Sequence, residues 1–186
     1  ASEKGLGVIV MEPLRGGKLV KGVPEQISKI YHTVHPSRTP AQWALRWVWN
    51  QPEVGLVLSG MNTMEDVVQN MVAANEGEAD SLNPQEIHAL HQVKAFYNGK
   101  IQIPCTTCAY CMPCPSGVNI PGNFGYFNDY FMFDSPKARD NTVKFYHYFI
   151  KPDASPSACV ECGQCEEKCP QKISIIEELK RVGELF

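Results

Sequence analysis

The feature that most constrains this chain is the spacing of its cysteines. All eight lie between residues 105 and 169 of the 186-residue sequence, in two runs that each place three cysteines two residues apart and add a fourth before a proline. Three thiolates at this spacing can wrap one cubane iron–sulfur cluster, and in two-cluster proteins the fourth ligates the other cluster. The sequence therefore predicts two [4Fe–4S] clusters, the first held by Cys105, Cys108, Cys111 and Cys169 and the second by Cys159, Cys162, Cys165 and Cys114.

The pattern also allows two other roles for these cysteines. Disulfides could pair the eight thiols, but neighbours two residues apart are poorly placed for this, and nothing in the sequence indicates secretion. Two structural zinc ions could each take four thiolates, although such sites usually combine two separate Cys-x-x-Cys units. The first run also departs from the ferredoxin pattern, because two residues rather than three precede Cys114. This departure bears on the geometry around Cys114 more than on the number of clusters.

The overall composition excludes several classes of partner. The chain has 17 basic and 20 acidic side chains, a net charge of −3 and no run of lysine or arginine, so we expect no nucleic-acid partner. The sequence contains no apolar stretch long enough to span a bilayer, and it does not open on a secretory signal. We therefore expect a cytoplasmic protein without a membrane partner.

The cysteines also divide the chain into two predicted domains, residues 1–98 and residues 103–186, with a short linker at 99–104. Between the two cysteine runs lie 10 of the 18 aromatic side chains, at a spacing that predicts helices with a break at Asp134-Ser135-Pro136. We expect these aromatics to form the core of a mostly helical domain and to exclude water from the clusters. A last helix is expected after Ser174, which forms a capping box with Glu177.

The first predicted domain alternates short apolar runs with helical patterns. Residues 7–11 and 54–58 are continuous apolar runs, as fully buried parallel strands would be. Helix starts are marked by capping residues at Thr39, Thr63 and Asn83. The order β-α-β-α predicts a parallel sheet that binds ligands at the carboxyl ends of its strands.

Two groups of side chains in this domain allow two interpretations each. Trp43, Trp47 and Trp49 lie on one helix, where they either fill the layer between helix and sheet or form a docking surface for another domain. His88 and His91 share a helix face, as metal ligands do, but the face offers no cysteine or acidic third ligand. Surface or core histidines are therefore the better interpretation.

Several of these segments together resemble the aldo/keto reductases, specifically the branch that ends in a ferredoxin-type domain. The resemblance runs through residues 8–19, 39–47 and 58–70 and continues into the cysteine phrases at 108–115 and 159–165. It implies an α/β fold followed by a mostly α domain. Residues 1–98 would form the last two βα units of a (β/α)8 TIM-type barrel, and a helical domain with two [4Fe–4S] clusters would follow.

The resemblance also implies that this chain is a part of a larger enzyme. A complete barrel needs eight strands, so the missing N-terminal part of the barrel is an expected partner. The family's catalytic Tyr, Lys, Asp and His belong to earlier strands, so no catalytic residue is assigned here. We expect this chain alone to have no carbonyl reductase activity.

A nicotinamide cofactor, NAD(P), is implied at the mouth of the barrel. The positions that match the family's cofactor loops are Met11, Pro13, Leu14, Arg15, Gly60, Met61, Asn62, Gln69 and Asn70. Met11 stands where relatives often carry the aromatic that stacks on nicotinamide. Gly60 and Asp66 stand where NADP-using relatives often carry Lys and Arg, and a 2′-phosphate favours such cations, which argues against tight NADP binding. Ordinary strand-to-helix turn chemistry is the alternative role of these loop residues.

Two functional hypotheses follow. In the first, the chain belongs to an oxidoreductase whose nicotinamide-linked barrel handles hydride while two clusters transfer single electrons, with a redox partner or a small-molecule carbonyl substrate. In the second, the clusters only hold the tail folded, and the chain is a binding or structural module. Unpaired strand edges of an incomplete barrel would also allow a homo-oligomer.

Overall fold

The chain folds into two units. A computed structural model describes residues 1–133 and 135–186, and it separates into Ala1–Phe96 and Tyr97–Phe186. The division falls in the last turn of helix α4 (Pro84–Asn98), slightly before the linker that the sequence suggests. Among the described residues, no helix has the length and apolarity needed to cross a membrane.

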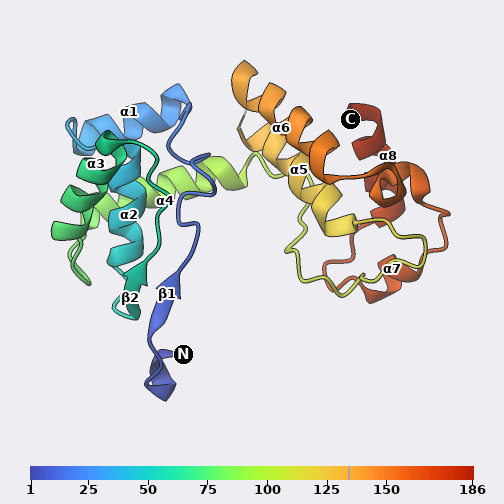
Figure 1. Ribbon diagram of the computed structural model, residues 1–186, viewed down its shortest axis with the longest axis horizontal. Helices are drawn as coiled ribbons and strands as arrows, with labels where there is room; N and C mark the ends of the chain where they lie inside the picture. The colour runs from blue at the N-terminus through green and yellow to red at the C-terminus, as the bar shows by residue number, and fades with distance from the viewer. Residues whose placement is uncertain (134) are drawn as a thin grey trace. The chain divides into compact units, whose positions relative to one another are not determined.

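The first unit combines a small sheet with four helices (Figure 1). Its elements, besides α4, are the 3-10 turn η1 (Ser2–Lys4), β1 (Val8–Val10), α1 (Glu25–Val34), α2 (Pro40–Trp49), β2 (Val54–Val57) and α3 (Met64–Asn75). Strands β1 and β2 are parallel, with Val8 opposite Val54 and Val10 opposite Val57. This pairing agrees with the β-α-β-α order of the sequence.

The two strands are more exposed than the sequence suggested. Ile9 is 61% exposed and Leu56 is 43% exposed, and neither strand contains a buried residue. The apolar runs at 7–11 and 54–58 therefore contain strands, but these strands are not buried in this structure. The physical reason is that the sheet has two strands in the described chain, and helix packing beside β2 covers only part of their surface.

The core of the first unit lies between its helices. Trp43 of α2 is fully buried, its ring stacks on Tyr31 of α1 with centroids 4.9 Å apart, and the Arg38 guanidinium lies 4.8 Å from the ring centre. Trp43 is thus core and not a docking surface, because α1 covers it. Trp47 is half exposed, and Trp49 packs so closely on Gly77 that a Cβ there would lie 2.6 Å from its ring.

Local capping fixes the starts of three helices in the first unit. The Thr39 hydroxyl accepts from the N–H of Gln42, and the Thr63 hydroxyl accepts from the N–H of Asp66. In both cases the third residue of the helix returns a bond to the N–H of the cap, which completes a capping box. Asn83 begins α4 in the same way, and its partner is Glu86. The predicted helix starts at Thr39, Thr63 and Asn83 are confirmed.

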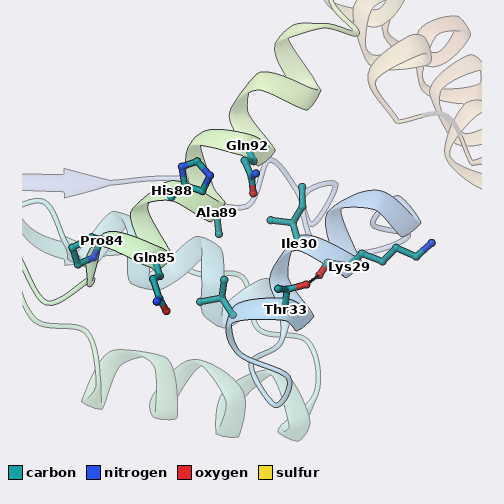
Figure 2. Close-up of a pocket in the computed structure, with 9 residues that line it drawn as sticks. Lys29, Ile30, Thr33, Pro84, Gln85, His88, Ala89 and Gln92 are labelled. Carbon is teal, nitrogen blue, oxygen red and sulfur yellow. Dashed lines mark hydrogen bonds between the residues drawn. The ribbon is translucent and has the colours of Figure 1, made fainter.

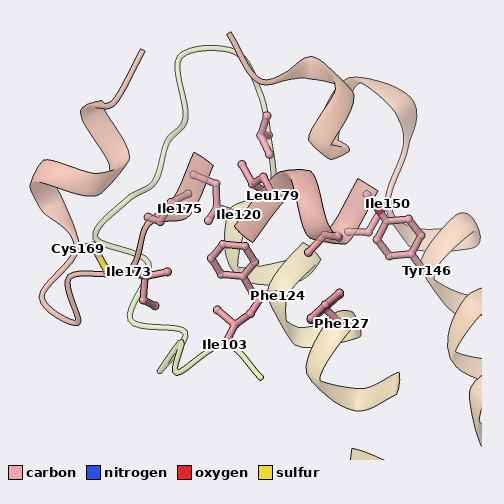
Figure 3. Close-up of a cluster of buried hydrophobic side chains, with 12 residues drawn as sticks. Ile103, Ile120, Phe124, Phe127, Tyr146, Ile150, Cys169, Ile173, Ile175 and Leu179 are labelled. Carbon is pink, nitrogen blue, oxygen red and sulfur yellow. The ribbon is translucent and has the colours of Figure 1, made fainter. Parts of the chain in front are cut away.

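The second unit is helical. Its elements after α4 are α5 (Ile120–Met132), α6 (Pro136–Phe149), the 3-10 turns η2 (Pro152–Ala154) and η3 (Pro156–Ala158), α7 (Gln164–Lys168) and α8 (Ile175–Leu185). Helix α5 packs against both α6 and α8, and one apolar core fills the space among them (Figure 3). Ser135 caps α6 by accepting from the N–H of Ala138, whereas Asp134, the first residue of the predicted break, lies outside the described residues.

Two local expectations for the second unit need correction. Residues 99–104 are not a free linker, because Ile103 is fully buried and hydrogen-bonded to Asn128 of α5. Ser174 precedes α8, but its side chain makes no capping bond. Instead the Glu166 carboxylate of α7 accepts from the N–H of Ile176 at 2.9 Å, so a residue from the preceding helix satisfies this end of α8.

Candidate metal centres

The eight cysteines gather around two small cavities of the second unit. Cys105, Cys108, Cys111 and Cys169 line the first, of about 20 Å³. The second cavity, of about 10 Å³, is lined by Cys114, Cys159, Cys162 and Cys165. The structure thus brings together the same two sets of four thiols that the sequence assigns to two clusters, and each set takes one cysteine from the opposite run.

The two runs share a backbone twist that curls the chain around each cavity. In the first run Thr107 and Ala109 have φ of 56° and 62°, and in the second run Glu161 and Gly163 have φ of 54° and 77°. These positions follow the first cysteine of each run by two and by four residues. Left-handed backbone is unfavourable for side chains other than glycine, and such strain concentrates at functional sites. In the first run the turn also directs the N–H of Thr107 toward the Cys105 sulfur, at 3.4 Å.

The runs differ beyond their third cysteine. In the second run the short helix α7 contains Cys165, and Cys169 follows as its C-cap. In the first run no helix joins Cys111 to Cys114; the N–H of Met112 instead donates to the carbonyl of Ala109. The two-residue spacing before Cys114 therefore gives a turn where the three-residue spacing gives a helix, and Cys114 still reaches the second cavity.

Apolar atoms form most of the surface of both cavities, although Thr106 and Gln171 also line the first and Ser116 the second. Their walls carry no charged side chain among the described residues, and Phe124, Ile175 and Leu179 contribute to them from α5 and α8. Cys169 is buried, and Figure 3 shows it beside Ile173. Cys108 and Cys162 are exposed, so each group of thiols also reaches the protein surface.

Burial affects the protonation of the thiols. It raises the pKa of Cys105, Cys111 and Cys165 above the ordinary cysteine value. Neighbouring sulfurs raise the pKa of Cys105 and Cys111 further, and Cys169 of the other run is among them. All eight cysteines lie within the described residues and have free thiols. Negative charge on thiolates so closely grouped would be stabilised by binding a cationic metal centre.

Helix α5 holds the approaches to both cysteine runs through two asparagines. The Asn128 side chain accepts from the N–H of Ile103 at 2.9 Å and donates to its carbonyl at 2.8 Å, two residues before Cys105. The Asn123 amide donates to the carbonyl of Ala154 at 2.9 Å, five residues before Cys159. Sequence reasoning missed both residues, although a polar side chain among helical aromatics is a signal that could have marked them.

The Asn123 side chain is also fully paired in the interior. It is 0% exposed, its amide also donates to the carbonyl of Asn119 at 2.8 Å, and its oxygen accepts from the Tyr146 hydroxyl of α6 at 2.8 Å. Buried polar networks that are fully satisfied make a fold rigid and specific. The start of α5, the end of α6 and the segment before the second run are therefore fixed together at one residue.

The predicted nicotinamide residues lie at the carboxyl ends of the two strands, around a cavity of about 490 Å³. Those that line it are Met11, Pro13, Leu14, Gly60, Asn62 and Asn70. Arg15, Met61 and Gln69 are not among its lining residues. The Asn70 amide donates to the Ser59 hydroxyl at 2.9 Å, which ties α3 to the loop after β2.

Asp66 lies at the same cavity and has a structural partner. Hydrogen bonds from Thr63 and from the N–H of Asn62 lower the pKa of its carboxyl group. Asp66 therefore carries a negative charge at neutral pH, and Lys21 brings a positive charge to the same cavity.

A second cavity of the first unit lies between α1 and α4 (Figure 2). It measures about 780 Å³, and His88 lines it together with Gln85, Gln92 and Lys29. His88 and His91 are both exposed, in agreement with their interpretation as surface histidines. Across residues 1–133 and 135–186, no three His, Cys, Asp or Glu side chains converge on one point as ligands of a single metal ion would.

Comparison with known proteins identifies the region that holds the cysteines. No curated protein and no solved structure matches the chain. Residues 104–174 match the family model described as a 4Fe-4S dicluster domain, and this match covers both cysteine runs and the helices between them. The described geometry and this match agree in the number of sites. Residues 104–174 are therefore similar to a 4Fe–4S dicluster domain, and this similarity supports iron–sulfur clusters at the two groups of thiols.

Proposed function

We propose that the second unit relays single electrons through two [4Fe–4S] clusters. The observation that carries this proposal is the division of eight thiols into two groups of four around two apolar cavities. When bound, such a cluster takes up and gives back one electron, at a potential that its surroundings set. The donor set fits this group, because thiolate sulfur is the usual ligand of iron–sulfur clusters.

The ligand sets in this proposal are crossed. Cys105, Cys108 and Cys111 would hold the first cluster with Cys169, and Cys159, Cys162 and Cys165 would hold the second with Cys114. Crossed ligation requires the two runs to lie beside each other, and the buried hydrogen bonds of Asn123 and Asn128 support this by fixing both approaches to α5. Exposed Cys108 and Cys162 give each site an edge at the surface, where an electron donor or acceptor could approach.

The protein's own contribution is to exclude water and to orient the thiols. Phe124, Ile175 and Leu179 keep the inner side of the cavities apolar. The N–H of Thr107 points at the Cys105 sulfur, and a hydrogen bond to a ligating sulfur stabilises its negative charge. Both effects act on cluster potential without any proton transfer.

We further propose that the first unit belongs to an aldo/keto reductase-like, nicotinamide-linked barrel that exchanges electrons with the clusters. This proposal rests on the sequence resemblance, and it is supported by the cavity at the carboxyl ends of β1 and β2, where six of the nine matched residues lie. Ligands of α/β proteins bind at such strand ends. Asn70 and the backbone of the loop at Pro13 would hold the dinucleotide, and Asp66 would disfavour the 2′-phosphate of NADP.

A purely structural role for the clusters is the alternative. One observation favours it: five of the cysteines pack against the apolar core of the second unit, as parts of a folding scaffold would. A redox titration of the chain separates the two functions. Clusters that are reduced and reoxidised reversibly support electron transfer, whereas clusters that do not change between strong oxidants and strong reductants support the structural role.

Metal analysis and two cysteine variants test the cluster assignment. Anaerobically prepared protein is expected to contain about eight iron and eight acid-labile sulfide per chain. Cys169→Ala should lose the cluster held by the first run, and the matched variant Cys114→Ala should lose the cluster held by the second run. Zinc without sulfide would contradict the whole proposal, and loss of each variant's own-run cluster would contradict only the crossed arrangement.

Binding of the dinucleotide is tested separately. Calorimetry with NADH and NADPH on the intact chain should show weaker binding of NADPH, and Asn70→Ala should weaken binding of both. Gln69→Ala is a matched control, because Gln69 bonds to Glu65 on the surface of α3 and does not line the cavity. An equal loss in both variants would contradict the assigned site.

A further inference from the structure

The two thiol-lined cavities share one side chain. Ile120, the first residue of α5, lines both, and it is the one described residue that does so. Its side chain is 1% exposed. Figure 3 shows Ile120 near Ile175, with Phe124 one turn further along α5. The side chain is therefore a common wall between the two sites.

The backbone of Ile120 is held from several directions. The Asn119 side chain caps α5 by accepting from the N–H of Gly122 at 3.1 Å, and the N–H of Asn119 donates to the carbonyl of Ala154 at 3.0 Å. Asn123, one turn further on, fixes the same carbonyl of Ala154 and the carbonyl of Asn119. Ile120 thus projects from a cap that is tied to the segment before the second cysteine run.

We propose that Ile120 is a positioning residue that sets the polarity at both cluster sites at once. This inference rests on the proposed function and deepens it, because it names one residue whose side chain affects the potentials of both clusters. A cluster bound by four thiolates becomes more negative when it takes up an electron, and a more polar environment favours the more highly charged form. A hydroxyl group or water at position 120 would therefore make both potentials more positive.

The neighbouring residues provide a matched set of variants. Ile173 lines the first cavity and not the second, whereas Ile176 lines the second and not the first. Val118 is fully buried in the same core, two residues from Ile120, and lines neither cavity. Substitution of each residue by threonine introduces the same hydroxyl group at four defined places.

The experiment is a redox titration of both clusters, monitored by electron paramagnetic resonance, in protein with full iron and sulfide content. We expect Ile120→Thr to shift both potentials in the positive direction. Ile173→Thr should shift the first cluster alone, Ile176→Thr the second alone, and Val118→Thr neither. If Ile120→Thr does not retain about eight iron per chain, Ile120→Ser places a hydroxyl group at the same position on a smaller side chain and decides the question by the same pattern.

Two results would overturn the inference. One is a shift of a single cluster, or of none, in the Ile120 variant that retains both clusters. The other is an equal shift of both clusters in Val118→Thr, which would make the effect one of general core packing. Failure of the proposed function looks different, because the unsubstituted protein would then lack iron and sulfide or would show no reversible reduction.

Discussion

The two units of this chain bury their apolar side chains in different ways. In Tyr97–Phe186, side chains from α5, α6, α8 and the cysteine loops form one continuous core. In Ala1–Phe96, the helices pack on one another, but the strands, the segments beside them and α3 leave large apolar side chains exposed. These are Leu6, Ile9, Met11, Leu56, Leu58, Met61, Met64, Val68, Met71 and Val72. In the second unit the outer face of α6 is exposed at Phe145, Tyr148 and Phe149.

The difference indicates what each unit depends on. In the first unit local caps define the starts of α2 and α3, and the helices are joined by contacts between residues far apart in the sequence, such as Arg38 and Glu86. In the second unit the cysteine runs are irregular. Side chains from α5 hold the segments before them, and in our proposal the clusters bind their thiols. We therefore expect the second unit to depend on its clusters and the first to depend on its helix contacts.

Removal of iron should have the largest effect, and it should affect the folding of the second unit much more than that of the first. Metal–thiolate binding contributes directly to the folding free energy of small metal-binding domains, by about 10 kcal/mol or more in zinc-finger peptides. We expect chelation under anaerobic conditions to unfold α5–α8 while the helices of the first unit stay folded. Hydrogen exchange measured by mass spectrometry would follow both units in one sample. Retained protection of α5 in iron-free protein would show that the second unit folds without its clusters.

The sequence allowed the local features of both units to be predicted, but not the long-range ones. The caps at Thr39 and Thr63 were predictable, because each bond spans three residues. The capping of α8 by Glu166 was not, because Ser174 offers an equally good local pattern and only the position of α7 selects between them. The degree to which each strand is covered could not be predicted for the same reason, since an apolar run does not reveal how many elements cover it.

The same distinction applies to the candidate sites. The grouping of the cysteines followed from spacing alone, because a fourth cysteine before a proline has a known use. The roles of Asn123 and Asn128 could not be read from spacing, because their partners lie about 30 residues away, at Ala154 and Ile103. The sequence also could not show that Ile120 lines both cavities, because the walls of each cavity come from segments far apart in the chain.

The ion pair of Glu86 with Arg38 should have the largest single-residue effect in the first unit. Both side chains are buried, at 4% and 9% exposure, and the pair joins the start of α4 to the loop before α2. Glu86→Ala leaves a buried guanidinium unpaired, so we expect a loss of about 3–5 kcal/mol in unfolding free energy. All three tryptophans lie on α2, so their fluorescence during urea unfolding reports this unit alone.

An exposed ion pair serves as the control for this variant. Glu25 bonds to Lys29 on the surface of α1, with side chains 80% and 73% exposed. Glu25→Ala should change the unfolding free energy by about 0.5 kcal/mol or less. Equal effects of Glu25→Ala and Glu86→Ala would mean that burial of the Glu86 pair contributes nothing.

Glu86 should also give the first unit a pH dependence. Burial raises the pKa of its carboxyl group, but the N–H of Asn83 and the Arg38 guanidinium outweigh this, and the net pKa is lowered. A carboxyl group whose pKa is lower in the folded state stabilises the fold above its ordinary value, about 4.3, and loses this contribution as the pH falls through the folded pKa. We expect tryptophan fluorescence to show acid destabilisation below about pH 4.3, and Glu86→Gln to reduce this dependence.

Substitution of Asn123 should have a smaller effect on stability, and it should affect the two clusters of the second unit unequally. Asn123→Ala leaves the Tyr146 hydroxyl without its acceptor and the Ala154 carbonyl with the N–H of Asn119 as its remaining donor, which costs about 1–3 kcal/mol. The second cluster should be released by chelator faster than the first, because Ala154 precedes the second run. Asn128→Ala is the matched variant and should release the first cluster faster. Identical release of both clusters in both variants would contradict separate roles for the two asparagines.

The exposed strand Val8–Val10 should show the smallest effect on stability. Ile9 is 61% exposed, so Ile9→Lys removes few contacts, and we expect the unfolding free energy to change by about 0.5 kcal/mol or less. An exposed apolar strand edge can pair with a second chain, and lysine on such an edge opposes this pairing. If copies of the chain associate through β1, sedimentation at increasing concentration should show oligomers in the unsubstituted protein and fewer in Ile9→Lys. A loss of more than about 2 kcal/mol in unfolding free energy would instead show that Ile9 is covered in the folded monomer, because substitutions at exposed positions rarely cost as much. The two units would then not differ in how they bury their apolar side chains.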